Sequence, residues 1–179
     1  MRILLALLFP MIAHAQTPLD RELIAAAERG DAVTVQKLIA RGANVNAQDA
    51  KQDSAFLIAS ANGHTEVVKL TLAAGADLKS TNRYGGTGLI PACHHGHLET
   101  VKLLLTTKID VNHVNNLGWT ALLEAVILGD GGPAHTEIVR QLLAHGASPK
   151  IADRDGVTAL EHARRRNYKG MVELLAKAA

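Results

Sequence analysis

The fold is decided by the stretch Gly96-His97-Leu98-Glu99-Thr100-Val101-Lys102-Leu103-Leu104-Leu105, because its opening recurs at a fixed interval. Gly63-His64 precedes Gly96-His97 by the same interval that separates Gly63-His64 from the earlier Gly30-Asp31. A fixed period of this length is typical of proteins built from stacked copies of one supersecondary unit. The 179 residues of the chain also suit a single domain.

Two further sets of residues repeat in the same register. Ser54, Thr87 and Thr120 follow one another at that same interval, and Thr158 comes after a slightly longer one, as if the fourth unit carried a short insertion. A third set recurs between units, as Gly42-Ala43-Asn44-Val45-Asn46, Gly75-Ala76-Asp77-Leu78, Ile109-Asp110-Val111-Asn112 and Gly146-Ala147-Ser148. Three independent sets in one register are too regular to arise by chance.

Each unit carries the signals of two helices separated by turns. In the second unit, Gly63 stands between two apolar stretches of helical spacing, where a residue with positive φ ends a helix. Thr65-Glu66 opens the next helix with an acidic residue in its first turn, and Gly75 ends it. One such hairpin cannot bury its apolar face alone, so the units are expected to stack. The predicted N-cap residues are Thr87, Thr120 and Thr158.

The sequence resembles the ankyrin repeat family in three stretches. They are the segment 96–105, Gly42-Ala43-Asn44-Val45-Asn46-Ala47, and Gly118-Trp119-Thr120-Ala121-Leu122-Leu123-Glu124-Ala125. The resemblance covers residues 19–178 and implies an all-α solenoid of stacked helix-turn-helix units with short projecting β-turns. Five units are expected, at 19–48, 49–81, 82–114, 115–152 and 153–178. The first lacks the threonine anchor and the last carries Arg164-Arg165-Arg166, as terminal caps would.

The N-terminus has the three parts of a secretory signal peptide. Met1-Arg2 supplies a positive charge, residues 3–12 are an apolar run broken by Pro10, and Ala13-His14-Ala15 is a small-x-small cleavage site. The run is far shorter than the roughly 20 residues that a membrane-spanning helix needs. We therefore expect cleavage after Ala15, a repeat domain over 16–179, and a periplasmic or secreted protein without stable membrane insertion.

Composition and motifs argue against several classes of function. The net charge of +2, with histidine neutral, gives no reason to expect nucleic acid or an anionic membrane as the main partner. Cys93 is the only cysteine, so no intramolecular disulfide can form. The sequence has no Gly-rich phosphate loop, no His-Glu-x-x-His and no Gly-x-Ser-x-Gly motif. We expect neither enzyme activity nor a cofactor.

The third and fourth units depart from the pattern. Lys108 replaces the glycine found at 42, 75 and 146, which should strain the turn if its φ is positive. Pro91 lies near the first turn of a predicted helix, and the insertion 130–134 lengthens the loop before His135. We expect residues 82–135 to be the least rigid part of the stack, and therefore less protected from hydrogen exchange than residues 50–80.

The cluster Cys93-His94-His95-Gly96-His97 contains good ligands for zinc or copper. However, Cys93 aligns with the small residues Ser60 and Val126, and neighbouring residues of a helix point about 100° apart. The resemblance implies that His97, like His64, braces turns by hydrogen bonds. A structural role is therefore favoured over a partner contact by His94 and His95, and a metal site is the least favoured reading.

Members of this family commonly bind through the projecting turns and the exposed side of each first helix, which together form a concave groove. Trp119, with Tyr84 and Leu117, would form an apolar patch there, unless Trp119 folds back onto its own turn. Arg83, Arg154 and Arg165 would flank the patch and favour a partner with an acidic surface. The candidate partner-binding residues are Arg83, Tyr84, His94, His95, Asn116, Leu117, Trp119, Ile127, Leu128, Arg154 and Arg165.

The sequence thus predicts a non-catalytic protein–protein interaction module, acting as a periplasmic binding or scaffold protein. A secreted effector or inhibitor that engages a host or rival protein is the main alternative. A metal- or haem-handling protein that uses the His94-His95 face is a weaker one. A monomer is expected, with a homo-oligomer through the Trp119 patch as the alternative.

Overall fold

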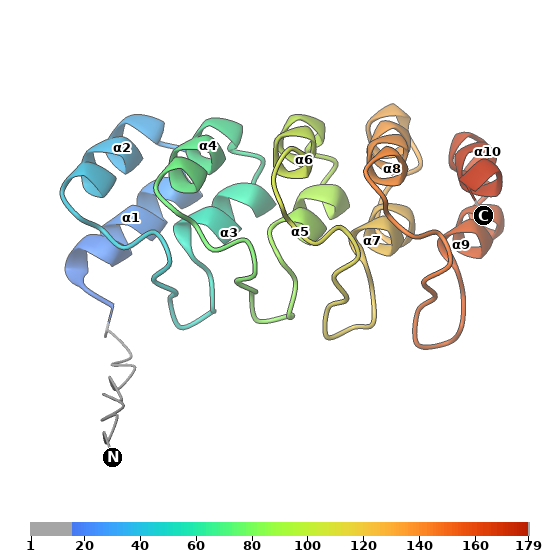
Figure 1. Cartoon of the computed structure of the whole chain (residues 1–179), viewed down its shortest axis with the longest axis horizontal. Helices are drawn as coiled ribbons and strands as arrows, with labels where there is room; N and C mark the ends of the chain where they lie inside the picture. Colours follow the sequence, from blue (N-terminus) through green and yellow to red (C-terminus); the bar gives the residue numbers. More distant parts are fainter. Residues whose placement is uncertain (1–15, 179) are drawn as a thin grey trace, which may run out of the picture.

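A computed structural model describes residues 16–178, which form five helical hairpins in a row (Figure 1). The predicted signal peptide and its cleavage site lie outside the described residues. No β-strand occurs among residues 16–178, where Ala152 and Thr158 form one isolated bridge. The helices are α1 Pro18–Glu28, α2 Ala32–Ala40, α3 Ala55–Ala61, α4 Thr65–Ala73, α5 Leu89–His94, α6 Leu98–Leu105, α7 Ala121–Ile127, α8 Pro133–Ala144, α9 Ala159–Arg165 and α10 Lys169–Ala178.

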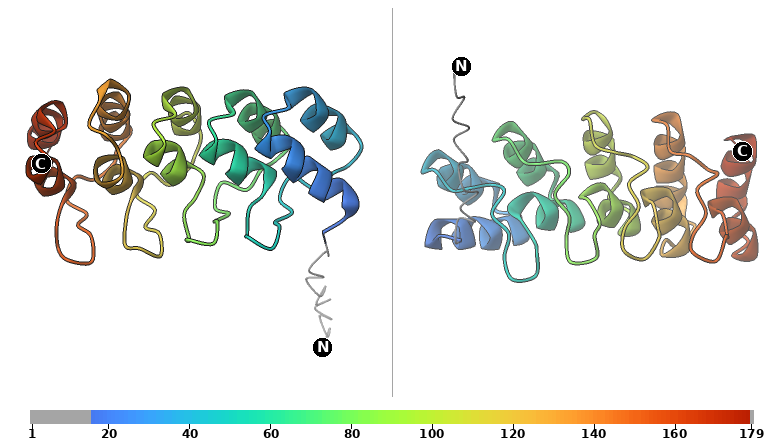
Figure 2. Two further views of the ribbon diagram at one scale, coloured as in Figure 1. Left: turned by 180° about the vertical axis from the view of Figure 1, so that it is seen from behind. Right: turned by 60° about the horizontal axis from the view of Figure 1, so that its bottom comes forward.

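The hairpins stack in register, so that the odd-numbered helices form one row and the even-numbered helices a second row (Figure 1). Each helix packs against its hairpin partner and against the next helix of its own row. The long turns between hairpins project together on the side of the odd-numbered row, as the two views of Figure 2 also show. The expected all-α solenoid is confirmed. Within residues 16–178, no helix has the length and apolar character to cross a membrane.

The repeated Ser/Thr anchors begin most of the odd-numbered helices. The hydroxyls of Ser54, Thr120 and Thr158 each accept a hydrogen bond from the backbone N–H three residues further on. In the first unit Arg21 stands at the register position of the anchor, as predicted, and Thr17, which precedes the predicted unit, caps α1 instead in a capping box with Asp20. The anchor is displaced because α1, with 11 residues, extends further toward the N-terminus than the 7-residue α3.

Thr87 does not cap a helix with its side chain, which corrects the prediction for the third unit. Its hydroxyl is buried and has no hydrogen-bond partner within residues 16–178, while its backbone oxygen accepts from Ile90 N–H. Gly88 follows where the second, fourth and fifth units have alanine, and a Cβ there would lie 3.0 Å from the Phe56 ring. Pro91 occupies the first turn of the short helix α5, as expected.

Glycine and histidine clamp successive hairpins together. Gly63 has φ of +73° at the end of the second hairpin's first helix, and a Cβ there would meet the His97 ring at 2.5 Å. His97 Nε2 is hydrogen-bonded to Ala61 O at 3.1 Å, and His64 Nε2 makes the same contact with Glu28 O one unit earlier. The bracing role that the resemblance implied for these histidines is confirmed.

The two departures in the sequence are accommodated differently from the prediction. Among residues 16–178 only Gln52 and Asn167 have positive φ without being glycine, so the strain predicted at Lys108 is absent. Helix α6 ends one residue earlier than α4, in a turn where Thr107 Oγ1 accepts from Ile109 N–H, and this removes the need for a left-handed residue. The insertion lengthens helix α8 as well as the loop, because Pro133 and Ala134 begin that helix.

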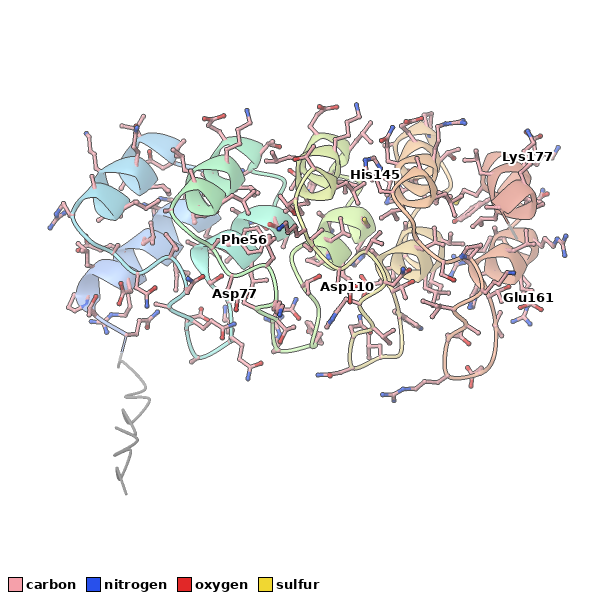
Figure 3. All side chains as sticks on the ribbon, in the orientation of Figure 1. Phe56, Asp77, Asp110, His145, Glu161 and Lys177 are labelled. Atoms are coloured by element: carbon pink, nitrogen blue, oxygen red, sulfur yellow. The ribbon has the colours of Figure 1, made fainter. Side chains whose placement is uncertain are left out.

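The core runs along the stack between the two rows and consists mainly of alanine, leucine, valine and isoleucine. Phe56 on α3, labelled in Figure 3, is a fully buried part of this core. Cys93, Ser60 and Val126 are buried at equivalent positions, as predicted. Small residues at these positions let adjacent first helices approach closely, which fixes the curvature of the surface opposite the core.

Candidate functional site

A groove of about 480 Å³ lies where the projecting turns meet the exposed side of the first helices. Helices α3, α5 and α7 supply one wall, and the turns around residues 51–53, 82–86 and 115–117 supply the other. Exposed apolar side chains border it, with Tyr84 51% exposed, Leu117 44% and Leu128 42%. This combination of a concave surface and exposed apolar residues is what a protein-binding surface requires.

The structure brings together six of the eleven candidate residues in this groove. They are Arg83, Tyr84, His94, His95, Leu117 and Leu128. Trp119 is not among its lining residues, being only partly exposed and packed against the hydrophobic core. The position of Trp119 therefore agrees better with the alternative in which it folds back onto its own turn than with an exposed apolar patch. Ile127, Arg165, Asn116 and Arg154 also lie outside the groove lining.

Asn116 and Arg154 connect neighbouring turns. Asn116 N–H donates to Tyr84 O at 2.9 Å, and the Asn116 side chain lies directly over Gly85. One turn further along, the Arg154 guanidinium donates to Asn116 O and packs over Gly118. These contacts connect neighbouring turns, so both residues stabilise the turns that line the groove without lining it themselves.

Arg83 lies in the groove with contacts of its own. Its guanidinium is 3.6 Å from an Asp53 carboxylate oxygen and lies over the Tyr84 ring, 4.6 Å from the centroid. Burial raises the pKa of Asp53, with the nearby Asp49 adding to this effect and Arg83 opposing it. Because Arg83 and Arg154 are both engaged within the molecule, the expectation of an acidic partner loses much of its support.

An asparagine or aspartate organises every projecting turn. Its Oδ1 atom accepts hydrogen bonds of 2.8 to 3.1 Å from the backbone N–H groups two and four residues further on. These turn residues recur at the same intervals as the Ser/Thr anchors, so the sequence also contained a signal for them. They are Asp49, Asn82, Asn115 and Asp153.

Glu124 is the residue of the groove that sequence reasoning missed. It lies on α7 with only 6% of its surface exposed, and Asn115 Nδ2 donates to its Oε1 atom at 2.8 Å. Burial raises its pKa to about 7, and the Asn115 hydrogen bond opposes this shift only in part.

The histidines on α5 stack instead of diverging. The rings of His94 and His95 lie 4.2 Å apart at an interplanar angle of 14°. Burial lowers the pKa of His94, with His95 adding to the effect, so the ring next to Glu124 is neutral at pH 7. Cys93 is fully buried, and burial raises the pKa of its thiol. Residues 16–178 contain no group of three or more histidine, cysteine or acidic side chains arranged to hold a metal ion.

Comparison with known proteins agrees with this architecture. The family model described as "Ankyrin repeats (3 copies)" matches residues 23–115, 56–149 and 108–179. The crystal structure of an ankyrin repeat domain from Acinetobacter baumannii AYE is 49% identical in sequence and superposes with a TM-score of 0.87. That match covers 92% of this chain and 87% of the other.

Two further relatives are similar. The crystal structure of the ankyrin repeat protein EF0377 is 39% identical with a TM-score of 0.84, covering 87% of this chain and 79% of the other. The putative ankyrin repeat protein YahD of Escherichia coli strain K12 is 47% identical over 55 residues. That match covers 31% of this chain and 27% of the relative, so the chain matches only about a quarter of the relative's length.

Proposed function

Since the chain belongs to the ankyrin repeat family, whose repeats are generally protein–protein interaction modules, we propose that it is a non-catalytic binding or scaffold protein of the periplasm. The partner is a protein that docks in the groove between the projecting turns and helices α3, α5 and α7. No turnover is assigned to the chain, and the signal-peptide pattern of residues 1–15 supports export.

One observation carries the assignment to the groove. Tyr84 comes from the third repeat and Leu117 and Leu128 from the fourth, yet all three line one hollow and expose roughly half of their surface. Large apolar side chains exposed at a concave surface lower the free energy of a complex when a partner covers them. The same surface of solenoid proteins is commonly used for binding.

Affinity capture tests this proposal. The chain from Gln16 onward is used as bait in periplasmic extract, beside a Tyr84→Ala/Leu117→Ala variant of the same chain. A matched control carries Val33→Ala/Val114→Ala, because these valines are also exposed but do not line the groove. We expect a protein that wild type and the control retain and the groove variant loses. Equal retention by all three baits would place the binding surface elsewhere.

A secreted effector or inhibitor is the second candidate. The groove and the signal-peptide pattern suit it equally well, so the two are separated by location and not by surface chemistry. Fractionation of cells should find the protein in the periplasm with a partner from the same cell. Recovery from the culture medium, with no partner in the periplasmic extract, would favour the effector.

A further inference from the structure

The floor of the groove contains a carboxylate whose charge is not balanced. Glu124 Oε1 accepts its hydrogen bond from Asn115, a neutral amide. Its Oε2 accepts none from residues 16–178, and the nearest ionisable atom paired with it is His94 Nδ1 at 3.9 Å, beyond hydrogen-bond distance. Glu124 nevertheless lines the open groove, so a group entering from solvent can reach it.

The other charges of the groove do not neutralise this site. Arg83 is paired with Asp53 and stacked on Tyr84, and Lys51 lies on an exposed turn. Glu28 also lines the groove, but as a carboxylate it cannot neutralise Glu124. The groove therefore presents three carboxylates against one lysine and one arginine, with Glu124 the most deeply placed of the carboxylates.

Besides Asn115 and His94, which contact Glu124, apolar side chains also line the groove. Leu117 and Leu128 border the groove on the turn side and the helix side, and Ile90 forms part of the lining between them. Lysine and arginine have long aliphatic stems that pack on such surfaces while the charged head reaches a carboxylate. The lining thus fits a cationic side chain with its stem better than a compact inorganic cation or an acidic group.

We propose that Glu124 is a specificity-determining contact that receives a lysine or arginine side chain of the partner protein, with Leu117 and Leu128 packing on its stem and on an adjacent apolar residue. This inference rests on the proposed function, since it names the chemistry of the partner for the same groove. The partner segment is basic and apolar, in contrast to the acidic surface that the arginines alone would suggest.

Selection from a library of random peptides, displayed on phage, tests the inference without knowledge of the partner. Wild type, Glu124→Gln and the control Glu173→Gln are used as targets, because Glu173 is an exposed carboxylate on α10 outside the groove. Glutamine keeps the acceptor for Asn115, so the variant retains its local hydrogen bond. We expect peptides with a basic residue beside apolar ones on wild type and on the control, and no basic preference on Glu124→Gln.

The best peptide is then measured by calorimetry in a double-mutant cycle. Replacing its basic residue by norleucine should weaken binding to wild type at least about tenfold and should weaken binding to Glu124→Gln hardly at all. Selection of apolar or acidic peptides by wild type would overturn the inference and leave the groove as a binding site. Selection of no peptide by any target would contradict both the inference and the proposed function.

Discussion

The fourth and fifth repeats each contain a contact between a projecting turn and the helix that follows it, here called a junction. The two junctions share the same backbone arrangement but differ in the chemistry of their side chains. In both, an Asx residue organises the projecting turn and its second side-chain atom contacts the residue nine positions further on. In the fifth repeat the two groups are a carboxylate and an imidazole, with Asp153 Oδ2 at 2.7 Å from His162 Nε2. In the fourth it is a neutral amide and a carboxylate, Asn115 and Glu124.

The difference separates a structural contact from a binding contact. Hydrogen bonds from Val157 N–H and then from the His162 side chain lower the pKa of Asp153, so the fifth junction satisfies its own charge. Glu124 has its pKa raised to about 7, because burial removes water and no cation replaces it. Above about pH 7, Glu124 therefore carries a charge that no cationic side chain among residues 16–178 pairs with.

The largest expected effect on stability comes from introducing only one residue of the Asp153–His162 pair into the fourth repeat. Asn115→Asp places a carboxylate at the Glu124 Oε1 atom, removes the donor, and should lower the free energy of unfolding at pH 8 by roughly 2 to 4 kcal/mol. Adding Glu124→His recreates the pair of the fifth repeat and should restore most of the loss. Urea unfolding of the two single variants and the double variant measures the coupling; purely additive effects would show that the junctions are not equivalent.

A smaller effect is expected when the unbalanced charge is removed. With a raised pKa, Glu124 destabilises the fold as pH rises from about 4.5 to about 7 and contributes a constant penalty above that. Glu124→Gln should therefore raise the free energy of unfolding by about 1 to 3 kcal/mol at pH 8, and by nearly nothing at pH 4. A matched series with Glu173→Gln should show no such pH dependence. A gain that is equal at both pH values would point to packing instead of charge.

The smallest effect is expected at His94. Because burial keeps this ring neutral and it lies 3.9 Å from Glu124, it does not act as the counterpart that His162 provides for Asp153. His94→Gln should change the free energy of unfolding at pH 8 by no more than about 0.5 kcal/mol. Thermal unfolding measures this, and a loss of several degrees in Tm would mean that His94 already balances Glu124.

The sequence was sufficient for the features that depend on local rules. The fixed period predicted the stacked hairpins, and the positions of Thr120, Thr158 and Gly63 predicted caps and helix ends that the structure contains. Each depends on backbone conformation within one unit or on its copy in the next.

The features that depend on neighbouring units were harder to predict. Thr87 does not cap α5 because this helix begins one residue later, with Gly88 at its N-cap, and Lys108 escapes strain because α6 ends early. Trp119 packs against the core. Its exposure depends on adjacent turns, so it could not be predicted from its own unit. Glu124 occupies the repeat position that holds Ile58, Pro91 and His162 in other units, so the residue type at this position varies along the stack. Only the assembled groove shows that Glu124 is buried.

In the proposed complex, a basic side chain of the partner pairs with the buried carboxylate of Glu124. The most direct test is the pKa of Glu124 from ¹³C NMR of its side-chain carboxyl group, recorded with and without the selected basic peptide. We expect Glu124 to titrate with a pKa of about 7 in the unliganded protein and with a clearly lower pKa in the complex. Titration near the ordinary value of 4.5 without the peptide, or no change when the peptide binds, would contradict it.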